Sequence, residues 1–247
     1  MRVAALYDIH GNLPALAAVL EEVRREGVDH VVVGGDVVPG PMVREALERL
    51  LRLDISVQFI RGNCEVEVLA ELTGAQSRLP ENIRAVIRWS GEQLAQDQKE
   101  LMASWPKTLR LEIPGVGVAV FCHGTPRDEN EIFTRRTPEE HLLPVFADVS
   151  ADLAICGHTH MQFDRMIGSV RVLNAGSVGM PFGQAGADWL VLGPGVELRH
   201  TEYDLARAAQ QIRATSYPQA EAFIADYLLK PPSEEKMLAA FAKAQLK

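Results

Sequence analysis

Apolar, β-branched runs that each end beside a polar, ligand-type side chain constrain the fold of this chain more than any other feature. Such runs include RVAALY, HVVVGGD, DISVQFIRGN, VAVFC and LAIC. The segments at or just after their ends are Asp8-Ile9-His10, Gly35-Asp36, Gly62-Asn63, His123-Gly124 and Gly157-His158-Thr159-His160. Continuous runs of this kind, joined by helices, are typical of parallel strands that are covered on both faces.

The first part of the sequence predicts alternating strands and helices. RVAALY, HVVVGGD and DISVQFIRGN are expected to form three buried strands. Apolar residues at helical spacing predict a helix over Leu13–Glu26, which Gly27 ends, and a second helix over Val43–Leu53. The expected result is an α/β fold with a mostly parallel sheet.

The next part changes from helices to short strands. Residues 64–105 are expected to be largely helical, with breaks near Thr73-Gly74 and Leu79-Pro80. The short strands that follow are predicted at TLRLEI, GVGVAVFC, DLAICG, FDRMIG, VRVLN, DWLVLG and VELRHTEY. Tight turns such as IPGVG and LGPGV indicate hairpins and favour antiparallel pairing. A helix over Pro138–Phe146 interrupts this part.

From Asp204 onward the chain is predicted to be helical again, with breaks at Tyr217-Pro218 and Pro231-Pro232. Because ligand-type segments occur in both halves, we expect one domain over residues 1–203 and a helical appendage over residues 204–247. The appendage is expected to pack on the domain, and a dimer contact is the alternative. Its apolar residues are Leu228, Leu229, Met237, Leu238, Phe241 and Ala242.

Composition and charge exclude several classes of protein. Of the 247 residues, 47% are hydrophobic, which is enough for a sizeable core. The net charge of −8, without a basic block, argues against binding to duplex nucleic acid. Cys64, Cys122 and Cys156 do not form a disulfide framework, and the last two are expected to be buried, so a reducing cytoplasm is the expected location. We expect no signal peptide and no membrane span, because the apolar runs are short.

The residue types in the strand-end segments predict a metal centre. Asp and neutral His suit borderline divalent metals such as Mn, Fe, Co, Ni or Zn. A single Asp or His at a strand end is more often a cap or a structural residue. Four of the 7 histidines, however, follow strands and stand beside or close to glycine, whereas His30, His141 and His200 do not. Seven ligand-type residues are enough for two ions: Asp8, His10, Asp36, Asn63, His123, His158 and His160.

The ordered set D-x-H, G-D, G-N, H-G and G-H-T-H closely resembles that of the calcineurin-like metallophosphoesterases. The match runs from Asp8 to the segment at residues 174–179, NAGSVG, which resembles the N-P-G-S segment of that family. The resemblance implies a four-layer α/β/β/α sandwich with a dimetal site at the sheet edge. It assigns Asp8, His10 and His160 to one metal, Asn63, His123 and His158 to the other, and Asp36 to both.

This resemblance implies a dimetal phosphoesterase, with manganese preferred, in which a hydroxide shared by the two ions attacks phosphorus. Two divalent ions exceed the charge of two carboxylates and one hydroxide, so the site attracts a phosphoryl group. We expect a small phosphodiester substrate, nucleotide-like or aryl, and a monomer or a homodimer. The alternatives are a phosphomonoesterase that uses the same site and a non-catalytic metal-binding scaffold.

Cys64 departs from the pattern of many relatives. Their motif reads G-N-H-[DE], whereas this chain reads Gly62-Asn63-Cys64-Glu65. A cysteine here resembles a bacterial and archaeal branch that includes small phosphodiesterases. A thiol is a weaker acid than imidazole, so we expect slow turnover of esters with poor leaving groups and faster turnover after Cys64→His. The alternative is a packing residue.

Further candidate residues follow the same motifs. The candidate catalytic residues are Cys64, Asn63 and His123. The candidate substrate contacts are Asn12, Arg127, Arg135 and Arg136. Asn12 is also a plausible helix N-cap, and a solvated loop is the alternative for the three arginines. The NAGSVG segment is expected to form a tight turn that supports the His158–His160 loop, and Phe133 either stacks on substrate or packs in the core.

Overall fold

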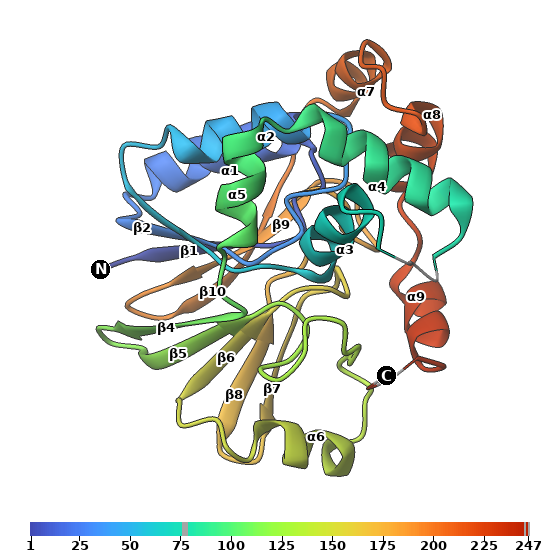
Figure 1. Cartoon of the computed structure of the whole chain (residues 1–247). Coiled ribbons are helices and arrows are strands. Elements are labelled where there is room, and N and C mark those ends of the chain that lie inside the picture. Colours follow the sequence, from blue (N-terminus) through green and yellow to red (C-terminus); the bar gives the residue numbers. More distant parts are fainter. Residues whose placement is uncertain (76–78, 245, 247) are drawn as a thin grey trace.

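Two sheets of five strands each, packed face to face, form the centre of the computed structural model (Figure 1). The structure describes residues 1–75, 79–244 and 246. The first sheet has the order β10-β9-β1-β2-β3. Its strands are β1 (Val3–Leu6), β2 (His30–Val33), β3 (Ser56–Phe59), β9 (Ala187–Leu192) and β10 (Val196–Thr201). β1, β2 and β3 are parallel, as predicted, and β9 joins β1 and β10 in antiparallel pairs.

The second sheet has the order β4-β5-β6-β8-β7. Its strands are β4 (Thr108–Ile113), β5 (Gly117–Cys122), β6 (Leu153–Cys156), β7 (Phe163–Ile167) and β8 (Val170–Asn174). The hairpins β4–β5, β7–β8 and β9–β10 are antiparallel, as their turns predicted. The antiparallel prediction was wrong for β5, β6 and β8, which pair in parallel. The long connection from β5 to β6 includes α6 (Glu139–Phe146), and a connection of that length lets the next strand run in the same direction.

Helices cover the outer face of each sheet, so the expected α/β/β/α sandwich is confirmed (Figure 1). α1 (Leu13–Arg25) and α2 (Val43–Leu51) pack on the first sheet, and α6 packs on the second. β1 shows how one strand serves two cores: Ala4 and Leu6 face the helices, whereas Val3 and Ala5 face the other sheet. This alternation follows from the period of two residues along a strand.

Of the remaining helices, the one at Gln96–Ala103 lies beside α1 and α2, and most of the others lie toward one side of the sandwich (Figure 1). The predicted helical stretch after residue 64 contains α3 (Asn63–Leu72), α4 (Glu81–Gln93) and α5 (Gln96–Ala103), while residues 76–78 lie outside the described part. The C-terminal stretch contains α7 (Leu205–Arg213), α8 (Ala220–Phe223), the π-helix η1 (Ile224–Leu229) and α9 (Glu234–Phe241). Of these C-terminal residues, Leu228 and Leu238 are buried and Leu229 is exposed.

The C-terminal helices pack against α4, where Trp89 contacts Tyr217 edge-on and joins a cluster with Phe223 and Leu228. The boundary at residues 203 and 204 stays a prediction. Among the described residues, every helix is too short or too polar to cross a membrane.

Candidate metal centre

Five of the seven predicted ligands have a left-handed backbone, and all seven occupy the loops that follow the strands or the start of α3. The φ angles are 53° at Asp8, 46° at His10, 54° at Asp36, 66° at His158 and 55° at His160. A non-glycine residue in this region costs about 1–2 kcal/mol. Such conformations persist only where the surrounding structure fixes them, and they gather at functional sites.

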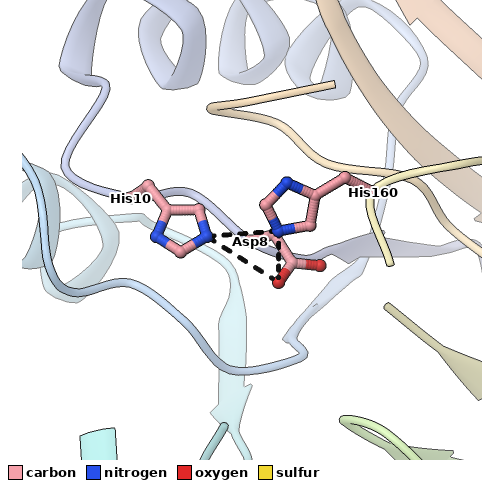
Figure 2. Close-up of side chains that lie close together, drawn as sticks. All are labelled: Asp8, His10 and His160. Carbon is pink, nitrogen blue, oxygen red and sulfur yellow. Dashed lines mark hydrogen bonds and ion pairs between the residues drawn. The ribbon is translucent and has the colours of Figure 1, made fainter. Parts of the chain in front are cut away.

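The first group of ligand atoms consists of Asp8, His10 and His160, and these atoms lie within 4.8 Å of one another. Figure 2 shows the three side chains pointing toward one another. His160 Nε2 lies 3.3 Å from Asp8 Oδ1 and 3.3 Å from His10 Nε2. The loop after β1 provides two of these residues and the loop after β6 provides the third, so the two sheets meet at this group.

The second group consists of Asp36, His123 and His158, whose ligand atoms also lie within 4.8 Å of one another. His123 Nε2 is 3.4 Å from Asp36 Oδ2 and donates a hydrogen bond of 3.0 Å to Asn63 Oδ1. The structure therefore brings Asn63 to the same group.

The two groups form one centre because Asp36 reaches both. Its Oδ2 atom lies 3.9 Å from His10 Nε2, which belongs to the first group. Asp8 Oδ1 in turn lies 3.8 Å from His123 Nε2, which belongs to the second group. A cation in either group would therefore have an Asp36 oxygen within reach.

The donor set fits divalent cations. Within the ligand set, the buried atoms Asp8 Oδ1 and His158 Nε2 have no hydrogen-bond partner. Leaving buried polar atoms unpaired is costly, and a cation in each ligand group would satisfy one of these two atoms. Carboxylate oxygens with imidazole nitrogens are the ligands that borderline divalent metals prefer.

The charges of the centre favour ionised carboxylates. Burial raises the pKa of Asp8 and Asp36, but the neighbouring histidines outweigh burial and lower both pKa values. Burial lowers the pKa of His123, but Asp36 and Asp8 outweigh it and raise that pKa to about 10. Burial and the nearby His123 lower the pKa of His158 to about 4. His158 is therefore ready to bind a cation, whereas His123 must first release a proton.

Hydrogen bonds from outside the ligand set fix the histidine rings. His123 Nδ1 donates to the carbonyl of Gly34 at 2.9 Å, and His160 Nδ1 donates to the carbonyl of Met180 at 2.9 Å. Each bond turns the Nε2 atom toward the centre, which is how outer partners orient metal-binding histidines. Phe182 also stacks on the ring of His160, with 5.1 Å between the centroids.

The NAGSVG segment supports the loops as predicted. Asn174 Nδ2 donates to the carbonyl of Gly157 at 2.5 Å and to Thr159 Oγ1 at 3.1 Å. Ser177 Oγ donates to the carbonyl of Asp8 at 2.7 Å. The segment therefore holds both the His158–His160 loop and the Asp8 loop.

Cys64 faces the centre. Its Sγ lies within 4.8 Å of ligand atoms of His10 and Asp36, and it accepts a hydrogen bond of 3.5 Å from Asn63 Nδ2. Burial, and then the charge of Asp36, raise the pKa of the thiol well above its ordinary value. The thiol is therefore neutral and lies beside the ligand groups, and its part in catalysis stays a prediction.

The predicted substrate contacts at Asn12 and the arginines have other partners. Asn12 is buried, caps α1 by accepting from the Ala15 N–H, and donates to the carbonyl of Gly179. The three arginines pair with glutamates: Arg127 with Glu131, Arg135 with Glu234 and Arg136 with Glu235. The structure thus favours the capping role of Asn12 and adds an ion pair to each arginine, and substrate contact by these four residues stays a prediction.

Phe133 packs in the core, which was one of its two predicted roles. It is buried and packs edge-on against Phe146 and Phe163.

Glu65 is a residue of the site that sequence reasoning missed. Its carboxylate accepts hydrogen bonds from four backbone N–H groups around the centre. Burial and the charge of Asp36 raise the pKa of Glu65 to about 7. The available signal was its position, three residues after the helix-capping Gly62.

Comparison with known proteins places this centre in a family. The chain is 26% identical over 240 residues to the uncharacterized protein MJ0912 of Methanocaldococcus jannaschii, covering 88% of this chain and 94% of that protein. Its fold is similar to that of the hypothetical protein PH1004 from Pyrococcus horikoshii OT3, with a TM-score of 0.79 and 23% identity over 94% of this chain and 99% of that one.

A metallophosphoesterase from Sphaerobacter thermophilus is similar as well, with a TM-score of 0.70 and 25% identity over 91% of this chain and 96% of that one. The family model described as the calcineurin-like phosphoesterase superfamily domain matches residues 1–193. The chain therefore belongs to the calcineurin-like phosphoesterase superfamily.

Proposed function

We propose that this protein is a dimetal-dependent phosphodiesterase that acts on small nucleotide-like or aryl diesters. The observation that carries the proposal is the pair of ligand groups that share Asp36. In this assignment Asp8, His10 and His160 hold one cation, and Asn63, His123 and His158 hold the other. Manganese is the preferred cation, and Fe, Ni, Co and Zn suit the same donors.

The residues of the centre would bind and orient the phosphate group. When bound, two divalent ions supply a water of lowered pKa and positive charge for the phosphoryl oxygens. Asp8 and Asp36 carry only two negative charges against the four positive charges of two such ions. The centre would therefore attract a phosphate anion although the chain has a net charge of −8.

Cys64 would lie beside the bound ester and act as a neutral donor toward the leaving oxygen. A neutral thiol is a weak proton donor, so esters whose leaving groups need little protonation are favoured. This reasoning supports activated or aryl diesters over simple alkyl esters. Turnover of alkyl esters is expected to be slow.

The test compares a chromogenic aryl phosphodiester with the matching aryl monoester on one preparation of the manganese-loaded protein. We expect the diester to turn over faster and both activities to vanish when a chelator removes the metal. Faster turnover of the monoester would replace the proposal with a phosphatase. Two bound ions without turnover of either ester would indicate a non-catalytic scaffold.

A further inference from the structure

A buried carboxylate outside the ligand set holds the backbone of the centre. Glu65 lies in the first turn of α3, and its side chain is 0% exposed. Its Oε2 atom accepts hydrogen bonds from the N–H groups of Asp36 at 2.8 Å and Gly62 at 2.7 Å. Its Oε1 atom accepts from the N–H groups of Val37 at 2.8 Å and Val38 at 3.3 Å.

The loop that donates to Glu65 also binds the other ligand loop through its carbonyls. The Asp8 N–H donates to the Gly35 carbonyl at 3.1 Å, and the His10 N–H donates to the Asp36 carbonyl at 2.9 Å. Asp36 Oδ1 in turn accepts the Cys64 N–H at 2.9 Å. The Glu65 carboxylate thus connects the loop after β2 to the start of α3, and the backbone of that loop in turn holds the loop after β1.

We propose that Glu65 is a positioning residue for the metal centre, whose carboxylate fixes the left-handed backbone of Asp36 and the start of α3 before any cation binds. This inference rests on the proposed metal centre. No lysine or arginine pairs with Glu65 among the described residues, so the hydrogen bonds from the four N–H groups offset the cost of burying its carboxylate.

The geometry requires two acceptor atoms, each with two donors. In Glu65→Gln one oxygen becomes an NH2 group, and that group would face two backbone N–H donors. The variant therefore loses two hydrogen bonds and gains a contact between donors. The loop of Asp36 is expected to leave its left-handed conformation part of the time, which would misplace a ligand that both cations need.

A matched control exists on the same helix. Glu71 is also buried in α3, but its carboxylate pairs with Arg84 and Arg88 and not with the ligand loops. Glu71→Gln therefore removes a buried carboxylate from α3 and leaves the backbone of the centre unchanged. Any effect that comes only from a less stable α3 would occur in both variants.

The first experiment measures Mn²⁺ affinity by calorimetry at neutral pH for the full-length wild type and both variants. We expect Glu65→Gln to weaken Mn²⁺ binding by about 10–100-fold, the range for outer-shell substitutions, and Glu71→Gln to leave it unchanged. Wild-type affinity in Glu65→Gln, or equal weakening in Glu71→Gln, would overturn the inference. If Glu65→Gln does not fold, Glu65→Asp takes its place, because it keeps the charge but is one methylene too short.

The second experiment measures amide hydrogen exchange in the metal-free proteins. We expect the amides of Asp36, Val37, Val38 and Gly62 to exchange about tenfold faster or more in Glu65→Gln than in the wild type and in Glu71→Gln. Unchanged protection of these amides would overturn the inference. A wild type that binds no Mn²⁺ but shows the faster exchange in Glu65→Gln would refute the proposed function and leave the role of Glu65 in the loop intact.

Discussion

Replacing Asp36 with asparagine is expected to weaken both cation sites, whereas replacing His158 or His160 is expected to weaken one. Asp36 Oδ2 is 3.4 Å from His123 Nε2 and 3.9 Å from His10 Nε2, so it reaches both groups. Asparagine keeps the size of the side chain and an oxygen that accepts the N–H of α3. Asparagine also tolerates a positive φ angle better than most residues. The backbone is therefore expected to be retained in Asp36→Asn, His158→Asn and His160→Asn.

The expected magnitude follows from linkage between binding and unfolding. A cation present at about 100 times its Kd stabilises the folded state by about 2.7 kcal/mol. In a chain of this size, 1 kcal/mol raises the Tm by about 2–4 °C. Two bound ions should thus raise the Tm by about 11–22 °C, and one ion by about half of that.

The assay is thermal unfolding with and without Mn²⁺, so that each variant is compared with its own metal-free form. His158→Asn and His160→Asn are expected to keep about half of the wild-type increase in Tm, and Asp36→Asn less than either. His141→Asn changes an exposed histidine of α6 and should keep the full increase. An increase in Asp36→Asn as large as in the single-histidine variants would refute the shared position of Asp36.

Three further predictions concern neighbouring residues. Gly62→Ala would place a methyl group against the Asp36 carboxylate, so Mn²⁺ affinity measured by calorimetry should fall although the φ angle of −97° accepts alanine. Cys64→His should raise the turnover of diesters with poor leaving groups, because protonated imidazole is a stronger acid than a thiol; a clear fall with intact metal content would contradict this. The hydrogen bond to Asp188 raises the pKa of His200, so this pair stabilises the fold below pH 6.5 and loses that effect as the pH rises through the raised value. The stability lost in His200→Gln, measured by urea unfolding, should therefore shrink from mildly acidic to alkaline pH.

The sequence could predict the strands, the helices and the loops that carry the ligands, because hydrophobic periodicity and glycine positions record them directly. It could not predict that β9 pairs with β1, since that contact joins residues more than 180 positions apart. The parallel pairing of β5, β6 and β8 was also hidden, because short strands near tight turns favour hairpins. Glu65 was missed because backbone N–H groups, which are nearly the same in every residue, leave no pattern in the sequence.

The left-handed ligands and the Glu65 hydrogen bonds together suggest how this centre stays ready for cations. The five ligands with positive φ angles and the buried carboxylates of Asp8 and Asp36 each reduce the stability of the fold unless other contacts compensate for them. Glu65, Asn174 and Ser177 form hydrogen bonds with groups of the loops other than the metal-facing ligand atoms. These contacts therefore need no cation, and the loops can hold their shape while Asp8 Oδ1 and His158 Nε2 remain unpaired. Cation binding then needs little rearrangement of the backbone. Because the loops are already ordered in the folded protein, binding does not have to offset the cost of ordering them, and the affinity is higher.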